Sequence, residues 1–238
     1  MNGSTNQFKG LFKLCGWIAL IQVVYSLVTM VILVLLGTPP TTAAETFNML
    51  QENKFIALLR MDLLTALVYM PLFYLLLLGL FVALKETHLV PTAIAVLLGC
   101  AGVTLFLATP SVFSWLALSD KFAAATDEAQ RNLLLAAGEA ILVSDMWHGT
   151  GAIIGGVLIQ VATTLISIIM LSSKAFGKST AYVGIFAHGL DLTRLLIGFF
   201  LPADGFILIA IAGPLYLVWF PLLARDFFRL GRISSIKS

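Results

Sequence analysis

The chain has 238 residues and a formal net charge of +2; 60% of its residues are hydrophobic and only 11% are charged. Soluble globular domains carry about 25% charged residues, so the composition excludes an ordinary soluble domain and favours a membrane protein. We expect the lipid bilayer as its partner, with a small-molecule ligand as a further candidate, and we expect no nucleic acid partner. The sequence identifies no protein partner.

The hydropathy pattern predicts six membrane-spanning helices. A helix needs about 20 mostly apolar residues to cross a bilayer. Six stretches meet this requirement: Leu11–Gly37, Asp62–Leu84, Leu89–Leu118, Gly149–Ser172, Thr180–Leu201 and Gly205–Ala224. The connections leave no room for a separate soluble domain, so residues 1–238 are predicted to form one all-α bundle of six transmembrane helices. None of the stretches alternates as the strands of a membrane β-barrel do.

The distribution of basic residues predicts the orientation. With six spans, both termini and the loops after the second and fourth spans lie on one side of the membrane. That side carries nine of the 14 Lys and Arg residues, the other side carries four, and Arg194 lies within the fifth stretch. Because Lys and Arg are enriched in cytoplasmic loops, we expect a multi-pass protein with both termini in the cytoplasm.

The first and third loops, on the predicted outer side, carry helix signals. Thr42 and Glu45 match a capping box, and the residues after them have one polar and one apolar face. In the third loop, Thr126 is predicted to cap a second amphipathic helix, whose first turn holds Asp127 and Glu128. Two arrangements stay open: the helices form a cap over the bundle, or they lie at the lipid–water boundary.

The fifth apolar stretch contains three ionisable residues, His188, Asp191 and Arg194. A charged side chain at the bilayer centre costs roughly 2.5–3.5 kcal/mol on insertion scales, so such residues are rare and usually functional. His188 and Asp191, and then Asp191 and Arg194, are three residues apart. This spacing places each pair on one helix face, so Asp191 and Arg194 are predicted to form an ion pair.

The depth of each polar residue predicts which side chains meet. A helix rises about 1.5 Å per residue, which puts Gln22, Gln160 and Asp191 close to the bilayer midplane. The turn between the fourth and fifth spans sets Gln160 beside His188 and Asp191, and the turn before the sixth span brings Tyr216 to similar depth. The candidate ligand-binding residues are therefore His188, Asp191, Arg194, Gln160, Gln22 and Tyr216.

Three interpretations of this cluster remain open. The first is the binding or transport of a small molecule, an ion or a proton at a mid-membrane site. The second is an ion pair that only holds the bundle together, since pairing removes most of the insertion penalty. The third is an intramembrane, hydrolase-like enzyme that uses His188 and Asp191 with Cys100 or a metal ion.

The sequence gives the enzyme little support. His88, His148 and His188 lie at different depths and cannot share one ion, so a metal site would need Asp145 with His148, or His188 with Asp191, plus further ligands. Cys100 lies in a run of small residues, which favours helix packing. The sequence therefore identifies no catalytic residue, the enzyme stays the less favoured alternative, and we predict no metal and no cofactor.

One short sequence recurs. Leu20-Ile-Gln-Val23 in the first stretch is repeated as Leu158-Ile-Gln-Val161 in the fourth. Inverted repeats of three spans are common in transporters, but the other stretches show no comparable match. Whether the two halves are repeats stays open.

The second half of the chain resembles a known family. The segments Leu118-Ser-Asp-Lys-Phe-Ala-Ala-Ala-Thr126, Leu135-Ala-Ala-Gly-Glu-Ala140 and Gly149-Thr-Gly151 are similar to those of a bacterial family of six-helix membrane proteins, catalogued as domain of unknown function 4386. Met170 through Lys178 and Leu230-Gly-Arg232 are similar to it too. The resemblance implies a bacterial cytoplasmic-membrane location and six spans. It implies no substrate, cofactor or active-site residue.

Overall fold

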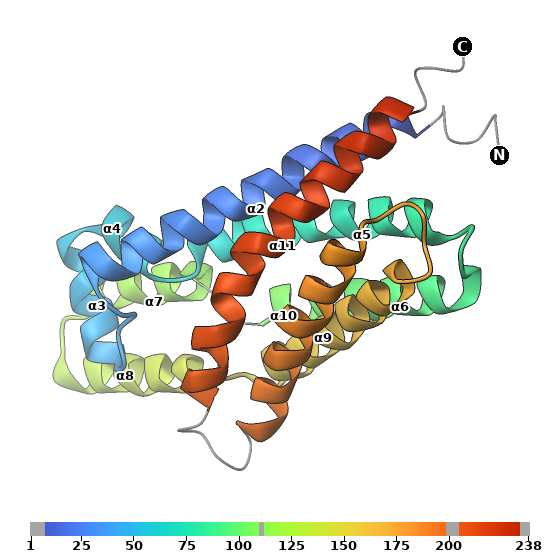
Figure 1. Cartoon of the computed structure of the whole chain (residues 1–238). Helices are drawn as coiled ribbons and strands as arrows, with labels where there is room; N and C mark the ends of the chain where they lie inside the picture. The colour runs from blue at the N-terminus through green and yellow to red at the C-terminus, as the bar shows by residue number, and fades with distance from the viewer. Residues whose placement is uncertain (1–7, 110–111, 199–204, 234–238) are drawn as a thin grey trace.

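The computed structural model describes residues 8–109, 112–198 and 205–233. All the regular secondary structure in these ranges is helical (Figure 1). The predicted all-α class is therefore confirmed for the described part of the chain.

The described residues form six long helical segments and four shorter helices. The shorter helices gather at one end of the body that the long ones form (Figure 1). The long segments are α2 (Lys9–Leu36), η1 (Thr65–Tyr69) continuing into α5 (Met70–Leu84), α6 (Leu89–Leu107), α9 (Thr150–Met170), α10 (Lys178–Ile197) and α11 (Gly205–Ile233). The short helices, which we call the cap, are α3 (Ala43–Glu52), α4 (Lys54–Arg60), α7 (Val112–Ala124) and α8 (Glu128–Leu142).

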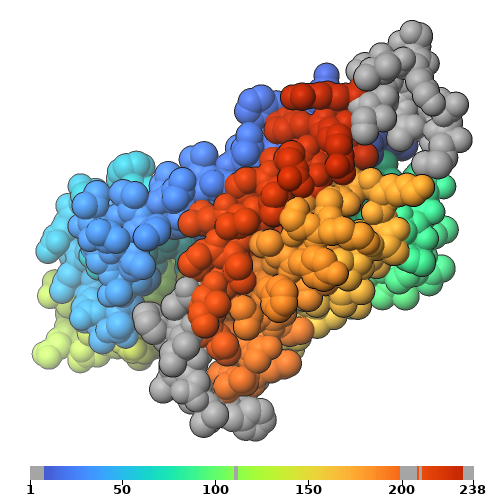
Figure 2. All heavy atoms as spheres, viewed as in Figure 1, coloured from blue at the N-terminus to red at the C-terminus, as the bar shows by residue number. Residues whose placement is uncertain are grey.

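The long helices pack in a closed ring. Each contacts two main neighbours, in the order α2, α5, α6, α9, α10, α11 and back to α2. The start of α2 and the end of α11 lie side by side, opposite the cap (Figure 1), where Phe12 stacks on Phe227 at 6.2 Å between ring centroids. Figure 2 shows α11 between α2 on one side and α9 and α10 on the other. We call the two ends of the ring the terminal end and the cap end.

Five segments of the described residues are long and apolar enough to cross a membrane. They are Lys9–Leu36, Thr65–Leu84, Leu89–Ala124, Thr150–Met170 and Ile211–Arg232. Helix α10 occupies the predicted fifth stretch but is not among them, because His188, Asp191 and Arg194 lower its mean hydropathy. Leu201, the predicted end of that stretch, lies outside the described residues.

The predicted third stretch, Leu89–Leu118, covers two helices with different neighbours. Helix α6 ends at Leu107 and packs in the ring, whereas α7 packs against α3 and α8 in the cap. The reason is Trp115, which is buried against Phe47 of α3 with its ring centroid 5.5 Å away. The apolar residues after 112 therefore fill the core of the cap instead of extending α6.

The helix caps differ in detail from the sequence expectation. Thr42 accepts a hydrogen bond from the backbone N–H of Glu45, and the Glu45 carboxylate accepts from the backbone N–H and the hydroxyl of Thr41. In α8 the capping residue is Asp127, whose Oδ1 accepts from Gln130 N at 2.7 Å; the prediction of Thr126 was wrong by one position. Asp127 offers a negatively charged acceptor, which suits the dipole of the helix start.

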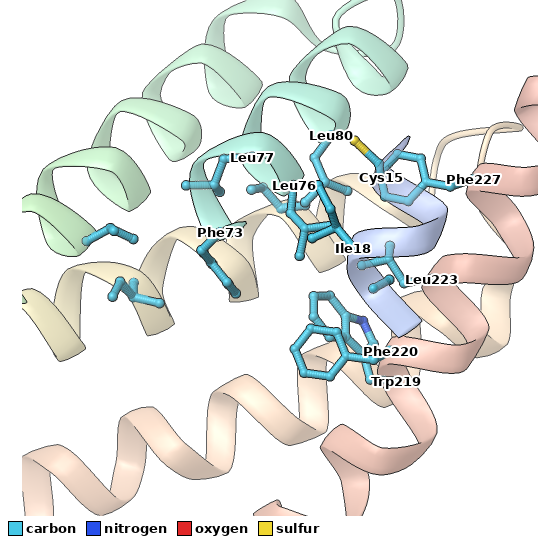
Figure 3. Packing of buried hydrophobic residues seen from close by; sticks show 14 of the residues in the cluster. Cys15, Ile18, Phe73, Leu76, Leu77, Leu80, Trp219, Phe220, Leu223 and Phe227 are labelled. Atoms are coloured by element: carbon cyan, nitrogen blue, oxygen red, sulfur yellow. The ribbon is translucent and has the colours of Figure 1, made fainter. Parts of the chain in front are cut away.

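The terminal half of the ring is filled by apolar side chains. Figure 3 shows how residues of α2, α5 and α11 interlock there. The side chains at its centre are fully or almost fully buried: Cys15, Ile18, Phe73, Leu76, Leu77, Leu80, Trp219, Phe220, Leu223 and Phe227. Close van der Waals packing of these side chains holds α2, α5 and α11 together in this half.

Burial stops part-way along two of the ring helices. The last buried residue of α2 is Gln22, although the helix continues to Leu36. The last buried residue of α10 is His188, although the helix continues to Ile197. Both positions mark the level at which the packed terminal half gives way to the cap half, and the candidate residues lie there.

Candidate functional site

Five of the six candidate residues form one hydrogen-bonded group, which we call the polar cluster: Gln160 of α9, His188, Asp191 and Arg194 of α10, and Tyr216 of α11. Helices α9, α10 and α11 are consecutive in the ring. The turns of the chain therefore bring the side chains together in the way that their depths predicted.

Asp191 is the centre of the polar cluster. Its Oδ1 accepts from Arg194 Nε at 2.6 Å, and its Oδ2 accepts from Gln160 Nε2 at 2.7 Å. The Tyr216 hydroxyl lies 3.3 Å from the same Oδ2. The side chains of Asp191 and Arg194 are 13% and 27% exposed, so the ion pair is shielded but is not closed off from its surroundings.

His188 lies beneath Asp191, on the side of the packed terminal half. Its Nδ1 is 2.8 Å from Gln160 Oε1, and because an amide oxygen only accepts, Nδ1 carries the hydrogen. Nε2 is then left as an acceptor, and it is buried without a hydrogen-bond partner. The indole N–H of Trp219 is also buried and unpartnered, and its ring meets the imidazole edge to face at 4.5 Å.

Gln22 does not join the polar cluster. Its Nε2 donates to the backbone carbonyl of Tyr69 at 3.0 Å, at the end of the π-helix η1. Proline follows at position 71 and lacks the N–H that would continue a regular helix, which explains an irregular turn here. Aromatic rings connect Gln22 with the cluster. The ring centroid of Phe220 lies 6.4 Å from that of Tyr69, the partner of Gln22, and 6.3 Å from that of Tyr216.

Two residues near the polar cluster were missed by the sequence reasoning. Trp219 lies three residues after Tyr216, near the middle of an apolar helix. A mid-span tryptophan is itself a signal, since Trp is usually found at membrane interfaces. Tyr69 precedes Met70-Pro71, and a proline inside an apolar stretch marks a place where the backbone departs from a regular helix.

A second carboxylate, Asp226, joins α11 to α10 near the terminal end. It is fully buried and accepts from Gly177 N at 2.8 Å and from Thr180 Oγ1 at 2.5 Å. Arg225 and Arg229 lie within 3.4 Å of it. Because it accepts from the backbone N–H of Gly177 and the hydroxyl of Thr180 at the start of α10, Asp226 acts as a helix cap supplied by another helix. No sequence spacing could have predicted this contact.

The cap end carries a third polar group, which holds the start of α9 to the start of the second span. Trp147 Nε1 donates to Asp62 Oδ1 at 2.5 Å, and Asp145 bonds both the ring and the backbone of His148 at 2.9 Å. Asp62 precedes the span Thr65–Leu84. Burial, reinforced by the negative charge of Asp145 and opposed by the Trp147 hydrogen bond, raises the pKa of the Asp62 carboxyl to about 6.

The groups required by the enzyme interpretation do not meet. Cys100 lies on α6, which α9 separates from α10 in the ring. Among the described residues no group of three or more His, Cys, Asp or Glu side chains is placed to hold a metal ion. The polar cluster offers hydrogen-bond donors and a fixed ion pair.

Comparison with known protein families, with curated proteins and with solved structures finds no match for this chain. The likeness to the family of domain of unknown function 4386 therefore stays a prediction. The functional argument depends on the geometry of the polar cluster alone.

Proposed function

We propose that this is a six-span membrane protein that binds a small polar molecule or ion at the polar cluster, as a binding protein or a transporter. The observation that carries the proposal is the position of the cluster. Gln22 of α2 and His188 of α10 are the last buried residues of their helices, and the cluster lies at this level. The ion pair therefore stands just beyond the buried part of α10, where both of its side chains are partly exposed.

An ion pair with a purely structural role has no need of that position. It would be best placed in the packed half, where Asp226 lies fully buried. Instead Asp191 and Arg194 stay partly exposed in a helix that pays an insertion penalty for them. Ligand sites of membrane transporters commonly lie at mid-depth between helices, and this placement supports the binding proposal.

The proposal includes the orientation. In it, α10 is the fifth of six spans, the terminal end faces the cytoplasm of a bacterial cell, and the cap covers the outer end of the ring. The distribution of basic residues supports this orientation. The contacts of Phe47 and Trp115 within the cap support a folded cover instead of helices lying separately at the lipid boundary. The ligand would enter from the outer side, through the cap half.

The direct test uses protein extracted from native membranes into lipid nanodiscs and examined by native mass spectrometry. The wild-type protein is expected to carry a small non-covalent adduct in addition to lipid. The double variant Asp191→Asn with Arg194→Gln keeps the size of both side chains and removes both charges, so it should lack the adduct. A wild-type protein that binds nothing, or an adduct that the double variant retains, contradicts the proposal.

A further inference from the structure

We infer that the ligand of the polar cluster is an anion, which presents a carboxylate or phosphate group to the two terminal nitrogens of Arg194. The inference rests on the proposed function and adds the chemical class of the ligand. It follows from an inventory of the donors and acceptors in the polar cluster.

Both Asp191 oxygens and Gln160 Oε1 already accept hydrogen bonds. The unpartnered acceptor, His188 Nε2, is buried on the side of the packed terminal half, against the ring of Trp219. Arg194 Nε binds Asp191 Oδ1 at 2.6 Å, while Gln160 Nε2 and the Tyr216 hydroxyl approach Oδ2 at 2.7 and 3.3 Å. Gln160 Oε1 in turn accepts from His188 Nδ1 at 2.8 Å. A cationic ligand would have to displace one of these donors from Asp191, and it would then face the guanidinium of Arg194.

The donors of Arg194 are mostly free. A guanidinium has five N–H groups, and within the described part of the chain only Nε–H has a partner. The four N–H groups on the two terminal nitrogens remain, on a side chain that is 27% exposed. Their fork matches the two oxygens of a carboxylate or phosphate. The bond from Nε to Asp191 fixes the plane of the fork before any ligand arrives.

Two sources can supply such a group. One is a soluble carboxylate that enters from the cap end; the other is the phosphate of a lipid headgroup, since Arg194 lies about 4.5 Å nearer the cap end than Asp191 by helix rise. Both place the same oxygens on the same nitrogens. The experiment below therefore has an arm for each source.

The soluble arm uses three probes with one aromatic body: phenylacetate, phenethylammonium and phenethyl alcohol. Thermal unfolding of the protein in phosphatidylcholine nanodiscs is followed by tryptophan fluorescence. Phenylacetate should raise the Tm of the wild type, and the cationic and neutral probes should not. In Arg194→Gln the Kd for phenylacetate should rise roughly ten-fold or more, since a charge-assisted contact is lost. Arg131→Gln, which removes an exposed arginine of α8, is the matched control and should respond like the wild type.

The lipid arm replaces part of the phosphatidylcholine with phosphatidylglycerol. A rise in Tm that Arg194→Gln abolishes supports the anion class and assigns the headgroup as its source. If Arg194→Gln does not fold, the double variant Asp191→Asn with Arg194→Gln takes its place, because it leaves no unpaired charge.

Two results overturn the inference. The first is a rise in Tm with phenethylammonium in both the wild type and the Arg194→Gln variant. The protein would then still have a ligand site, but its ligand would be a cation. The second is the absence of any response to phenylacetate or phosphatidylglycerol. If the native adduct is present in that case, only the anion class fails; if the adduct is missing too, the proposed function fails with it.

Discussion

The two halves of the helix ring are built on different principles. The terminal half is an apolar core in which even a carboxylate, Asp226, is fully buried and bonded to the start of a helix. At the boundary with the cap half, the carboxylate of Asp191 is partly exposed and binds Nε of Arg194, whose terminal nitrogens have no partner among the described residues. Asp226 therefore holds α10 and α11 together, whereas Asp191 orients the guanidinium of Arg194 towards the proposed ligand. Burial, and not residue type, separates the two roles.

The largest effect is expected from breaking the Asp191–Arg194 pair on one side only. Asp191→Leu should lower the free energy of unfolding by about 3 kcal/mol, because it leaves an uncompensated charge in a shielded position. Adding Arg194→Leu should recover most of the lost free energy of unfolding, since two apolar side chains then replace the ion pair. Chemical denaturation in mild detergent measures both. A double variant as unstable as the single one would mean that the pair is a major structural element.

Two glycines of α10 compare a packed position with an open one. A methyl group at Gly184 would lie 2.4 Å from Ser167 Oγ and 2.5 Å from Trp219 Nε1, whereas one at Gly189 would have no neighbour within 4 Å. Gly184→Ala should therefore destabilise the protein by about 2 kcal/mol. Gly189→Ala should be neutral or stabilise it by up to about 1 kcal/mol. Equal Tm values for the two variants would show that the contact of α10 with Ser167 and Trp219 can rearrange to accept a methyl group, which would contradict the prediction.

The two repeated glutamines should differ in the same way. Gln160→Leu removes the partner of His188 Nδ1 and one partner of Asp191, so we expect a loss of about 1–2 kcal/mol. Gln22→Leu frees only the carbonyl of Tyr69 and also removes a buried oxygen that has no partner. Its loss should stay below about 1 kcal/mol. The comparison is made by thermal unfolding, and a larger loss at Gln22 would contradict it.

The smallest effect is a dependence on pH at the cap end. The pKa of Asp62 is raised from an ordinary 3.8 to about 6 in the folded protein, so folding favours its protonated form. The stability from this group is full below pH 3.8 and is lost as the pH rises through about 6. Asp62→Asn keeps an acceptor for Trp147 and should remove this part of the slope of Tm between pH 3.8 and about pH 6.

The control for that measurement is Asp120→Asn, which changes an exposed carboxyl of α7 that pairs with Lys54. Its slope should match the wild type. An Asp62→Asn variant with an unchanged slope would place the pH response elsewhere in the chain.

The sequence predicted the elements whose signals are local. Hydropathy found the apolar helices, and helix rise found the meeting of Gln160 with His188 and Asp191, because both depend on distances along the chain. It failed at Gln22, whose partner is a backbone carbonyl made available by the irregular turn before Pro71. It also failed at Trp115, since nothing local distinguishes an apolar residue that crosses the bilayer from one that fills the cap.

Contacts between distant residues explain the remaining misses. Asp226 meets Gly177 and Thr180 across more than forty positions of the chain, and Trp147 meets Asp62 across 85. Taken alone, Asp226, Asp62 and Trp147 each resemble a residue at the interface of a membrane and water. Their pairing depends on which helices are neighbours in the ring, and a single sequence does not state that order.

The central claim is that water reaches the polar cluster from the cap half and not from the terminal half. The most direct measurement is thiol labelling in a background with Cys15→Ala and Cys100→Ala, using a charged maleimide that does not cross membranes. Tyr216→Cys, at the cluster, should react readily in the folded protein, and Ile166→Cys, which replaces a fully buried residue of the terminal half, should react only after denaturation. Equal, slow labelling at both positions would contradict the account.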